Sequence, residues 1–253
     1  MSSLKKTLIV LILAAVVLLA AACGTQEPVA ETPVTAPTTV PTDIPVAVAT
    51  PEVGVACDLP LPASEDWEVV LCETFDDNSY GWQEETQDNP YSIYTSAVTG
   101  GKFVVDYRAK SFAGFTRSAL TWFDVAEERN FVISVTGQVD SAFADSSWGV
   151  AFRGDEDSYF LFSLVNDTYV FEVFEDNRWL PLITPKQDTL IRVGEPNTVR
   201  IEAGGGDFFF TINGEMVNQF TGAALPGEAI QLVVSAKEGA SAVFIFDDVV
   251  LQR

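Results

Sequence analysis

The chain contains no histidine, and this absence excludes several kinds of chemistry at once. Ser-His-Asp and Cys-His nucleophilic sites need an imidazole as general base, and imidazole is also the commonest side-chain ligand for transition metals. Any catalysis would therefore depend on carboxylates, tyrosine, lysine or a hard metal ion held by oxygen atoms.

Basic residues are also scarce. Lys and Arg total 14 against 36 Asp and Glu, which gives a formal net charge of -22. A charge of this sign repels phosphate backbones and leaves no basic stripe to release counterions, so the composition excludes nucleic acid as a partner. It also disfavours adsorption of the protein to anionic lipid.

A long apolar run stands at the N-terminus, where Lys5 and Lys6 precede residues 7–22. A short basic segment, an apolar stretch and small residues before a cut site predict a secretory signal peptide over residues 1–22. The order Leu19-Ala20-Ala21-Ala22-Cys23-Gly24 resembles the lipobox of bacterial lipoproteins. The resemblance implies cleavage before Cys23, lipid on its sulfur, and an extracytoplasmic protein anchored to the cell membrane or the outer membrane.

Two other interpretations of this N-terminus stay open. The first is a transmembrane anchor, although the run is shorter than the roughly 20 residues that a helix needs to cross a bilayer. The second is an ordinary secretory signal in which Cys23 carries no lipid.

A linker follows, and the character of the sequence then changes. Residues 23–56 hold six of the 13 prolines and no Lys, Arg or aromatic residue, which predicts a disordered, extended tether with a reach on the order of 100 Å. Residues 57–253 are long enough for one β-sandwich domain with a sizeable core. With Cys23 lipidated, Cys57 and Cys72 remain; export permits a disulfide between them, and two buried free thiols are the alternative.

Short segments rich in Val, Ile, Phe, Tyr and Thr alternate with Gly, Asn and Asp turns throughout this domain, which predicts an all-β antiparallel sandwich. The expected strands are 68–75, 91–97, 102–108, 115–122, 130–140, 147–153, 158–165, 168–175, 178–183, 189–193, 197–203, 207–212, 215–220, 229–236 and 242–251.

Two hairpins can be placed in register. Asn213-Gly214 is a strong type I′ turn signal after the alternating Phe208, Phe210 and Ile212. In the other hairpin Asn166-Asp167 forms the turn, so that Leu161 faces Glu172 and Tyr159 faces Phe174.

One face of the second hairpin then collects six large apolar residues and must belong to the core. The neighbouring strand sends Trp148, Val150 and Phe152 to the same side, which predicts Arg153 beside Tyr159 and Glu172 on the opposite face. A planar cation and an aromatic ring above small residues suit a shallow sugar site; an Arg153–Glu172 ion pair on a solvated face is the alternative.

Several short motifs follow one another along the domain in an order that resembles that of a known superfamily. They are Phe75-Asp76-Asp77 with Gly81-Trp82, Trp148 to Arg153 followed by Tyr159 to Phe162, Asn197 to Ile201, Phe210 to Gly214, and Phe246 to Val249. Together they resemble the concanavalin A-like lectin/glucanase superfamily, in the branch of laminin-G-like and keto-disaccharide-hydrolase-like domains. The resemblance covers residues 70–253 and implies a jelly roll whose concave face often binds carbohydrate and whose first and last strands are neighbours.

The acidic residues of these motifs suggest a metal site. The resemblance places Asp76 and Asp77 beside Asp247 and Asp248, and such an oxygen-rich cluster would suit a structural Ca²⁺ ion; ordinary turn chemistry is the alternative. No other cofactor is expected.

Glycoside hydrolysis needs two carboxylates about 5 to 10 Å apart. Related glucanases alternate acids along one strand, but Phe174 stands where a second acid should follow Glu172, and Glu175 falls on the other face. We therefore expect a non-catalytic module that binds carbohydrate or another extracellular ligand, with Trp122 and Trp179 as further candidates to stack on a sugar. A carbohydrate-active enzyme and a structural or protein-interaction module of the cell envelope are the alternatives.

Overall fold

The computed structural model describes residues 57–63, 67–110, 115–119, 123–124, 130–140, 146–154, 158–223, 225, 227 and 229–253, and for 115–119 and 123–124 it describes the backbone alone. The predicted signal peptide, Cys23, the predicted linker and Trp122 therefore lie outside the described residues. Within these ranges the chain forms strands and turns, and no helix there could cross a membrane.

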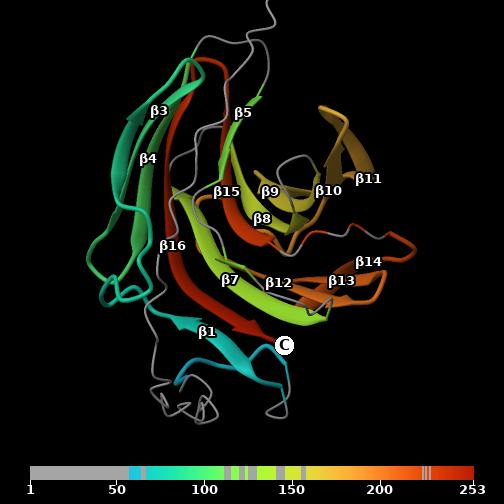
Figure 1. The fold of residues 1–253 in the computed structure, drawn as a ribbon. Coiled ribbons are helices and arrows are strands. Elements are labelled where there is room, and N and C mark those ends of the chain that lie inside the picture. Colours follow the sequence, from blue (N-terminus) through green and yellow to red (C-terminus); the bar gives the residue numbers. More distant parts are fainter. Residues whose placement is uncertain are drawn as a thin grey trace, which may run out of the picture. The chain divides into compact units, whose positions relative to one another are not determined.

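The strands form two antiparallel sheets (Figure 1). The nine-stranded sheet has the order β14-β13-β12-β7-β16-β4-β3-β2, with β1 also paired to β16. Its strands are β1 (Val69–Glu73), β2 (Glu85–Asp88), β3 (Ser92–Val98), β4 (Phe103–Ala109), β7 (Phe131–Asp140), β12 (Asn197–Gly204), β13 (Asp207–Ile212), β14 (Glu215–Phe220) and β16 (Ser241–Gln252).

The seven-stranded sheet has the order β11-β10-β9-β8-β15-β5, with β6 also paired to β15. Its strands are β5 (Phe115–Ala119), β6 (Phe123–Asp124), β8 (Ser146–Gly154), β9 (Tyr159–Val165), β10 (Thr168–Glu175), β11 (Arg178–Gln187) and β15 (Ala229–Lys237).

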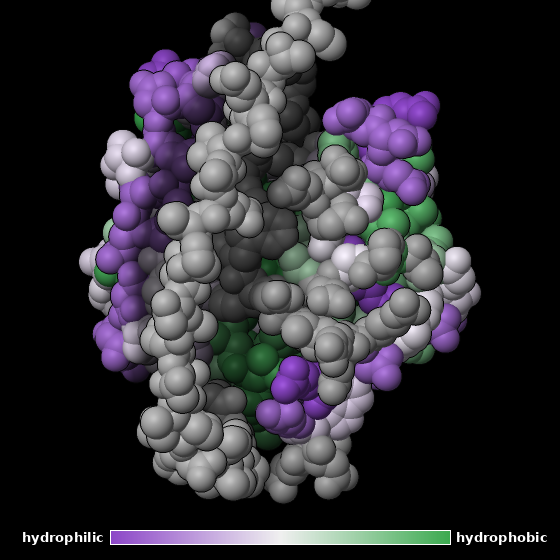
Figure 2. All heavy atoms as spheres, in the orientation of Figure 1, coloured by the Kyte–Doolittle hydropathy of each residue, from purple (hydrophilic) through white to green (hydrophobic). Residues whose placement is uncertain are grey.

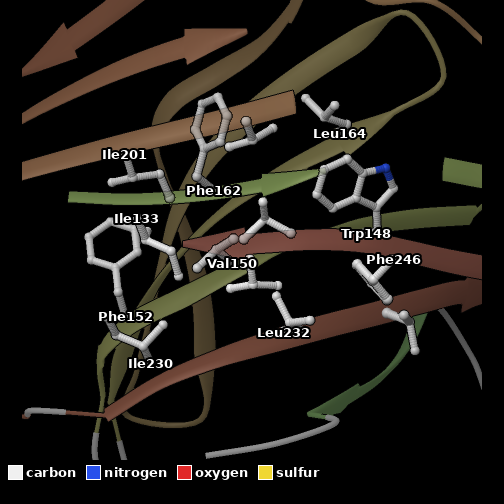
Figure 3. Packing of buried hydrophobic residues seen from close by; sticks show 14 of the residues in the cluster. Ile133, Trp148, Val150, Phe152, Phe162, Leu164, Ile201, Ile230, Leu232 and Phe246 are labelled. Atoms are coloured by element: carbon white, nitrogen blue, oxygen red, sulfur yellow. The ribbon is translucent and has the colours of Figure 1, made fainter. Parts of the chain in front are cut away.

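The core lies between the two sheets because alternate residues of each strand point inward. Trp148, Val150 and Phe152 of β8 are buried there, as their alternation predicts, and Figure 3 shows them among residues of the neighbouring strands. Rings from the two sheets stack on each other: Phe162 of β9 and Phe210 of β13 have centroids 4.4 Å apart. By contrast, hydrophilic residues cover much of the outer side of β3 and β4 (Figure 2).

Both predicted hairpins are confirmed. Leu161 pairs with Glu172 and Tyr159 pairs with Phe174 across the β9–β10 hairpin. In the β13–β14 hairpin Asn213 and Gly214 both have positive φ, at 51° and 90°, as a type I′ turn requires.

The start and the end of the domain are joined, as the family resemblance implies. β1 pairs with β16 over Val69 to Glu73, and Glu68 and Arg253 exchange two backbone hydrogen bonds of 3.0 Å. Cys57 and Cys72 form a disulfide with Cα atoms 5.5 Å apart. The backbone N–H of Ala63 also donates to Gln252 Oε1 at 2.7 Å, so the segment before β1 is held at several points.

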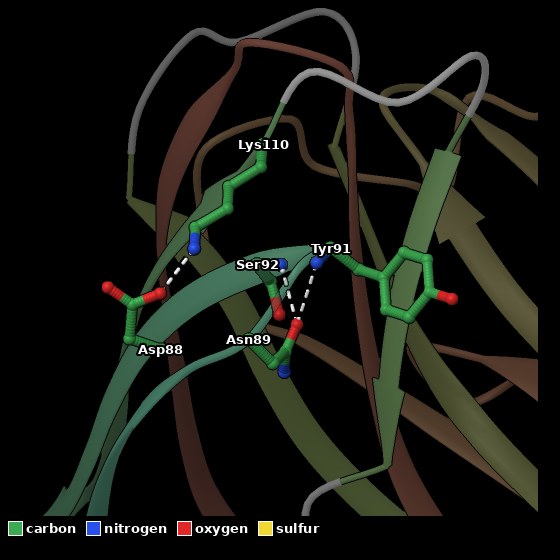
Figure 4. Close-up of polar contacts among 5 residues, drawn as sticks. All are labelled: Asp88, Asn89, Tyr91, Ser92 and Lys110. Carbon is green, nitrogen blue, oxygen red and sulfur yellow. Dashed lines mark hydrogen bonds and ion pairs between the residues drawn. The ribbon is translucent and has the colours of Figure 1, made fainter.

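Strand β2 was not expected from the sequence, because Glu85-Thr86-Gln87-Asp88 carries no apolar alternation. Polar contacts hold it in place (Figure 4). Lys110 pairs with Asp88, and Asn89 Oδ1 accepts the backbone N–H groups of Tyr91 and Ser92 at 2.8 and 2.9 Å, which closes the turn into β3.

The predicted strand over 189–193 is wrong. Asp188 instead starts a turn in which its carboxylate accepts the N–H of Leu190 at 3.0 Å and its carbonyl accepts the N–H of Ile191 at 3.3 Å. The preceding strand β11 continues to Gln187 in spite of Pro181 and Pro185, since β11 is an edge strand with one side free of pairing.

Candidate functional site

The side of the seven-stranded sheet that faces away from the core, here called the outer face, is the candidate site. In Figure 1 the sheet curls so that its edge strands β5 and β11 rise beside the middle strands β8 and β9. Antiparallel pairing arranges the side chains of the outer face in rows that cross the strands. One row contains Gln231, Ala151, Leu161 and Glu172, and the next contains Val233, Gly149, Ser163 and Val170.

A pocket of about 370 Å³ opens on the outer face. This volume falls within the range of small-ligand sites, about 300 to 1,000 Å³. The hydroxyl groups of Ser147 and Ser235, on β8 and β15, are hydrogen-bonded to each other at one side of it. The pocket is lined by Ser147, Ser163, Val165, Asn166, Thr168, Val170, Glu172, Pro185 and Ser235. It therefore offers several hydroxyl groups, an amide and one carboxylate over small apolar side chains.

Gly149 lies in the floor of this face between Val233 and Ser163. A Cβ atom added there would come within 2.3 Å of the carbonyl oxygen of Phe162 and within 2.7 Å of Ser163 Cα. Real Cβ atoms do not approach backbone so closely, so the close approach of β8 to β9 requires glycine at this position.

Three aromatic residues form a cross-strand row at one end of the face. Phe174 of β10 pairs with Tyr159 of β9 on one side and with Trp179 of β11 on the other. The ring centroids lie 5.3 Å apart for Tyr159–Phe174, 5.1 Å for Phe174–Trp179 and 5.5 Å for Tyr159–Trp179. We call these three residues the aromatic cluster. Tyr159 and Trp179 pack against the buried Leu161, Ala151 and Val233, so the cluster adjoins an apolar floor.

The β10–β11 turn holds the aromatic cluster in register. Asp176 and Asn177 both have positive φ, at 53° and 56°, which matches a two-residue type I′ hairpin turn. Hydrophilic residues gather at this end of the molecule in Figure 2. The aromatic cluster is thus bordered by the exposed polar residues Glu175 to Arg178.

The structure brings three of the predicted ligand residues together. Tyr159 and Glu172 belong to the outer face, as expected, and Trp179 joins them there through its pairing with Phe174. Glu172 also lines the pocket. Trp122 lies outside the described residues.

Arg153 does not lie with Tyr159 and Glu172, so its predicted position is wrong. Its side chain is only 4% exposed, its guanidinium lies 4.8 Å from the centroid of the core ring Phe208, and it donates to the carbonyl of Gly205. The cause is a β-bulge. Between the pairs Gln231–Ala151 and Ala229–Gly154, β8 advances three residues while β15 advances two, and Arg153 has φ 49°. Regular alternation therefore ends at Phe152, and Arg153 turns back toward the core.

The predicted calcium site is not assembled. Asp76 accepts the Thr74 hydroxyl at 2.9 Å, Asp77 accepts the N–H of Ser79 at 2.8 Å, and Asp247 pairs with Lys102. No group of three acidic or thiol side chains within the described ranges could hold a metal ion.

The positions and pKa values of these four aspartates follow from contacts with residues close to them in the structure. Asp247 and Asp248 occupy a bulge of β16, between the pairs Phe246–Gly137 and Val249–Val135. Hydrogen bonds from Ser79 lower the pKa of Asp77. Burial and the neighbouring Asp247 raise the pKa of Asp248, and Lys102 opposes this shift. The motif thus serves turn and bulge chemistry, which was the alternative interpretation.

Sequence reasoning missed other members of the outer face. The sequence shows Phe174 where a second acid would stand, but its predicted pairing with Tyr159 is also the signal that the two rings lie side by side. Gln231 and Ser235 carry no local signal of their position, because the pairing of β15 with β8 joins residues about 80 positions apart.

The chain is similar to known proteins in its three-dimensional structure, and its sequence matches none of those compared. No family model and no curated protein matches the chain. Similar solved structures include the catalytic domain of an endo-1,3-β-glucanase (laminarinase) from Thermotoga petrophila, with a TM-score of 0.51, 9% identity, and coverage of 75% of this chain and 99% of that chain. The endo-β-1,3-glucanase from Pyrococcus furiosus has a TM-score of 0.52, 10% identity, and coverage of 74% and 94%.

A third similar structure is the carbohydrate-binding module CBM66 from Bacillus subtilis, with a TM-score of 0.47, 13% identity, and coverage of 68% of this chain and 99% of that chain. The likeness to the two glucanases, at 9% and 10% identity, shows a shared fold and not a shared activity. The chain is therefore an antiparallel β-sandwich with the jelly-roll architecture of the concanavalin A-like fold.

Proposed function

We propose that this protein is a non-catalytic carbohydrate-binding module, held outside a bacterial membrane by lipid on Cys23. The observation that carries the proposal is the outer face of the seven-stranded sheet, which combines a hydroxyl-lined pocket of about 370 Å³ with the aromatic cluster. The membrane anchor is supported by the basic and apolar N-terminal segment that ends at Cys23.

The chemistry of this face suits a sugar. A pyranose ring has an apolar side that packs on aromatic rings and an edge of hydroxyl groups that need hydrogen-bond partners. Trp179 and Tyr159 supply the rings, while Ser163, Thr168 and Glu172 supply polar groups near an apolar floor. Such a mixture, apolar with a few polar groups, is typical of small-ligand sites.

The arrangement of acids favours binding over hydrolysis. Among the described residues that line the pocket, Glu172 is the sole carboxylate. Phe174, two residues further along β10 and on the same face, occupies the place where an alternating second acid would stand. Since glycoside hydrolysis uses two carboxylates, a single one supports recognition of a glycan.

Glycoside hydrolysis remains the second candidate because two of the similar structures are β-1,3-glucanases. Their names also suggest the first ligand to test, a soluble β-1,3-glucan such as laminarin.

The test is glycan binding by the full chain, purified in mild detergent, measured by a glycan array and by titration calorimetry. Replacing Trp179 or Tyr159 by alanine should weaken binding about 30-fold, since aromatic anchors at binding sites typically contribute about 2 kcal/mol. Tyr80→Ala is the matched control, because Tyr80 is an exposed aromatic residue, 41% accessible, in the segment between β1 and β2.

Two results would overturn the proposal. One is the absence of binding to any glycan of the array. The other is the release of reducing ends from a glycan by the wild-type protein but not by Glu172→Gln, which would establish the enzyme instead.

A further inference from the structure

Two serine hydroxyl groups in the wall of the pocket keep hydrogen-bonding capacity that the protein does not use. Ser147 of β8 and Ser235 of β15 pair across the strands, and their hydroxyl groups are hydrogen-bonded to each other. The two residues are 7% and 2% exposed, and both line the pocket. Within the part of the chain that the structure describes, these hydroxyl groups bond to each other alone. They carry two hydrogen atoms and their mutual bond uses one, so the pair keeps one O–H group to donate.

A second hydroxyl pair in the domain shows what a purely structural pair looks like. Thr136 of β7 and Thr198 of β12 pair in the other sheet, with their Oγ1 atoms 2.9 Å apart. Both threonines are only partly buried, so water can reach the hydrogen-bonding groups that they have left. The serine pair is buried more deeply. A buried donor without a partner destabilises the folded state, so the remaining O–H group of the serine pair calls for an acceptor inside the pocket.

The same pocket joins the serine pair to Glu172. Val165 of β9 pairs with Ser147, and two residues earlier on β9 Ser163 pairs with Val170 of β10. Glu172 follows Val170 on the same face of β10. All five of these residues line the pocket, and Ser163, which is 4% exposed, adds a hydroxyl group between its two ends. One ligand in the pocket can therefore reach both the serine pair and the carboxylate.

The two ends of this path are too far apart for a single sugar residue. Ser147 and Glu172 are separated by two strand pairings and by the four residues from Thr168 to Glu172 along β10. With strands about 4.8 Å apart and about 3.4 Å per residue along a strand, their Cα atoms stand roughly 17 Å apart. Side chains of a strand stand roughly perpendicular to the sheet, so they shorten this distance little. A ligand that contacts both ends must contain more than one sugar residue.

We propose that the Ser147–Ser235 hydroxyl pair is a ligand-contacting subsite of the pocket. The pair donates a hydrogen bond to an oxygen atom of an oligosaccharide, and Glu172 accepts hydroxyl groups at the other end of the same ligand. Ser163 lies between these two contacts. This inference rests on the proposed function and adds two residues that recognise the ligand and a ligand class, an oligosaccharide in place of a single sugar.

The test compares two double variants in the full chain, Ser147→Ala with Ser235→Ala and, as a matched control, Thr136→Val with Thr198→Val. Each removes both hydroxyl groups of a cross-strand pair, and replacement of both partners by apolar groups should change stability little. Affinity is measured by titration calorimetry for laminarin, laminaritriose and glucose. Where the array identifies a different glycan, its polymer, trisaccharide and monosaccharide are measured in the same way. Stability is measured by urea unfolding.

The serine double variant should bind the trisaccharide about fivefold more weakly than the wild type, which corresponds to about 1 kcal/mol for one neutral hydrogen bond. Its urea midpoint should stay close to that of the wild type. Ser147→Ala and Ser235→Ala alone should each lose less affinity, because the remaining hydroxyl group can turn to the ligand. The threonine control should match the wild type in both measurements. The wild type should bind the monosaccharide at least tenfold more weakly than the trisaccharide.

Other results overturn the inference in distinguishable ways. If the wild type binds an oligosaccharide and the serine double variant binds it within twofold, the pair makes no ligand contact and the proposed function stands. If affinity and urea midpoint fall together in that variant, the pair has a structural role. A monosaccharide that binds as tightly as the trisaccharide would refute the ligand class. A wild type that binds no glycan would refute the proposed function itself, and this inference with it.

Discussion

Removal of the Cys57–Cys72 disulfide is the sharpest test of how the start of the domain is held. The bond closes a loop with a sequence separation of 15. In the chain-entropy model a loop of this length raises the free energy of the unfolded state by about 3 kcal/mol. For a domain of about 200 residues each kcal/mol moves Tm by about 2–4 °C, so a double variant with alanine at both positions should lose about 6–12 °C.

The structure indicates that this loss arises in the unfolded state. Without the bond, Ala63 still donates to Gln252 Oε1 at 2.7 Å, and Glu68 and Arg253 keep their two backbone hydrogen bonds of 3.0 Å. The segment before β1 should therefore stay in place in the folded variant. Hydrogen exchange should show the amides of Glu68 and Arg253 as protected as in the wild type.

The assay is thermal unfolding of the full chain with and without dithiothreitol. The wild type should lose stability on reduction, and the double alanine variant should not respond, which controls for other effects of the reductant. A Tm shift below 2 °C with both amides still protected would refute the loop-entropy reasoning. Loss of protection at Glu68 and Arg253 would instead place the effect of the disulfide in the folded state.

Two further predictions concern charge and location. Burial and Asp247 raise the pKa of Asp248 in the folded state, so ionisation of Asp248 lowers the stability of the fold as pH rises through the folded-state pKa. Asp248→Asn should therefore be slightly more stable than the wild type near pH 7. Urea unfolding should show this gain vanish below about pH 3.9, the unfolded-state pKa of Asp, and a gain that persists there would contradict the cause given. Cys23→Ser should abolish incorporation of labelled palmitate and release the protein from the membrane fraction; a variant that keeps its label would exclude Cys23 as the lipid site.

Much of the sandwich could be predicted because its signals are local. Alternation along single strands placed Trp148, Val150 and Phe152 in the core. The turn at Asn166-Asp167 fixed the register of its hairpin, and Asn213-Gly214 set the first pairs of the other hairpin, up to a bulge between Phe210 and Thr211. A two-residue turn leaves little freedom to its flanking strands, so such features need no knowledge of the rest of the fold.

Predictions failed where regular alternation or apolar patterning was interrupted. The extra residue of β8 turned Arg153 from the outer face to the Phe208 ring. The polar strand β2 is held by pairing with β3 and by the Asn89 turn, which a search for apolar residues does not detect. The grouping of the four aspartates rested on the family resemblance, whereas in the structure Asp76, Asp77 and Asp247 contact Thr74, Ser79 and Lys102, respectively.

Composition, alternation along single strands and an N-terminal signal are properties of neighbouring residues. They therefore sufficed to predict an all-β sandwich without histidine chemistry and an exported, tethered chain. Which residues share the outer face depends instead on pairing between distant strands. β15 joins β8 from about 80 residues away, and this pairing sets Gln231 in one row with Glu172. Such long-range pairing depends on how the two sheets bury their apolar faces together, so it cannot be predicted from any short stretch of sequence.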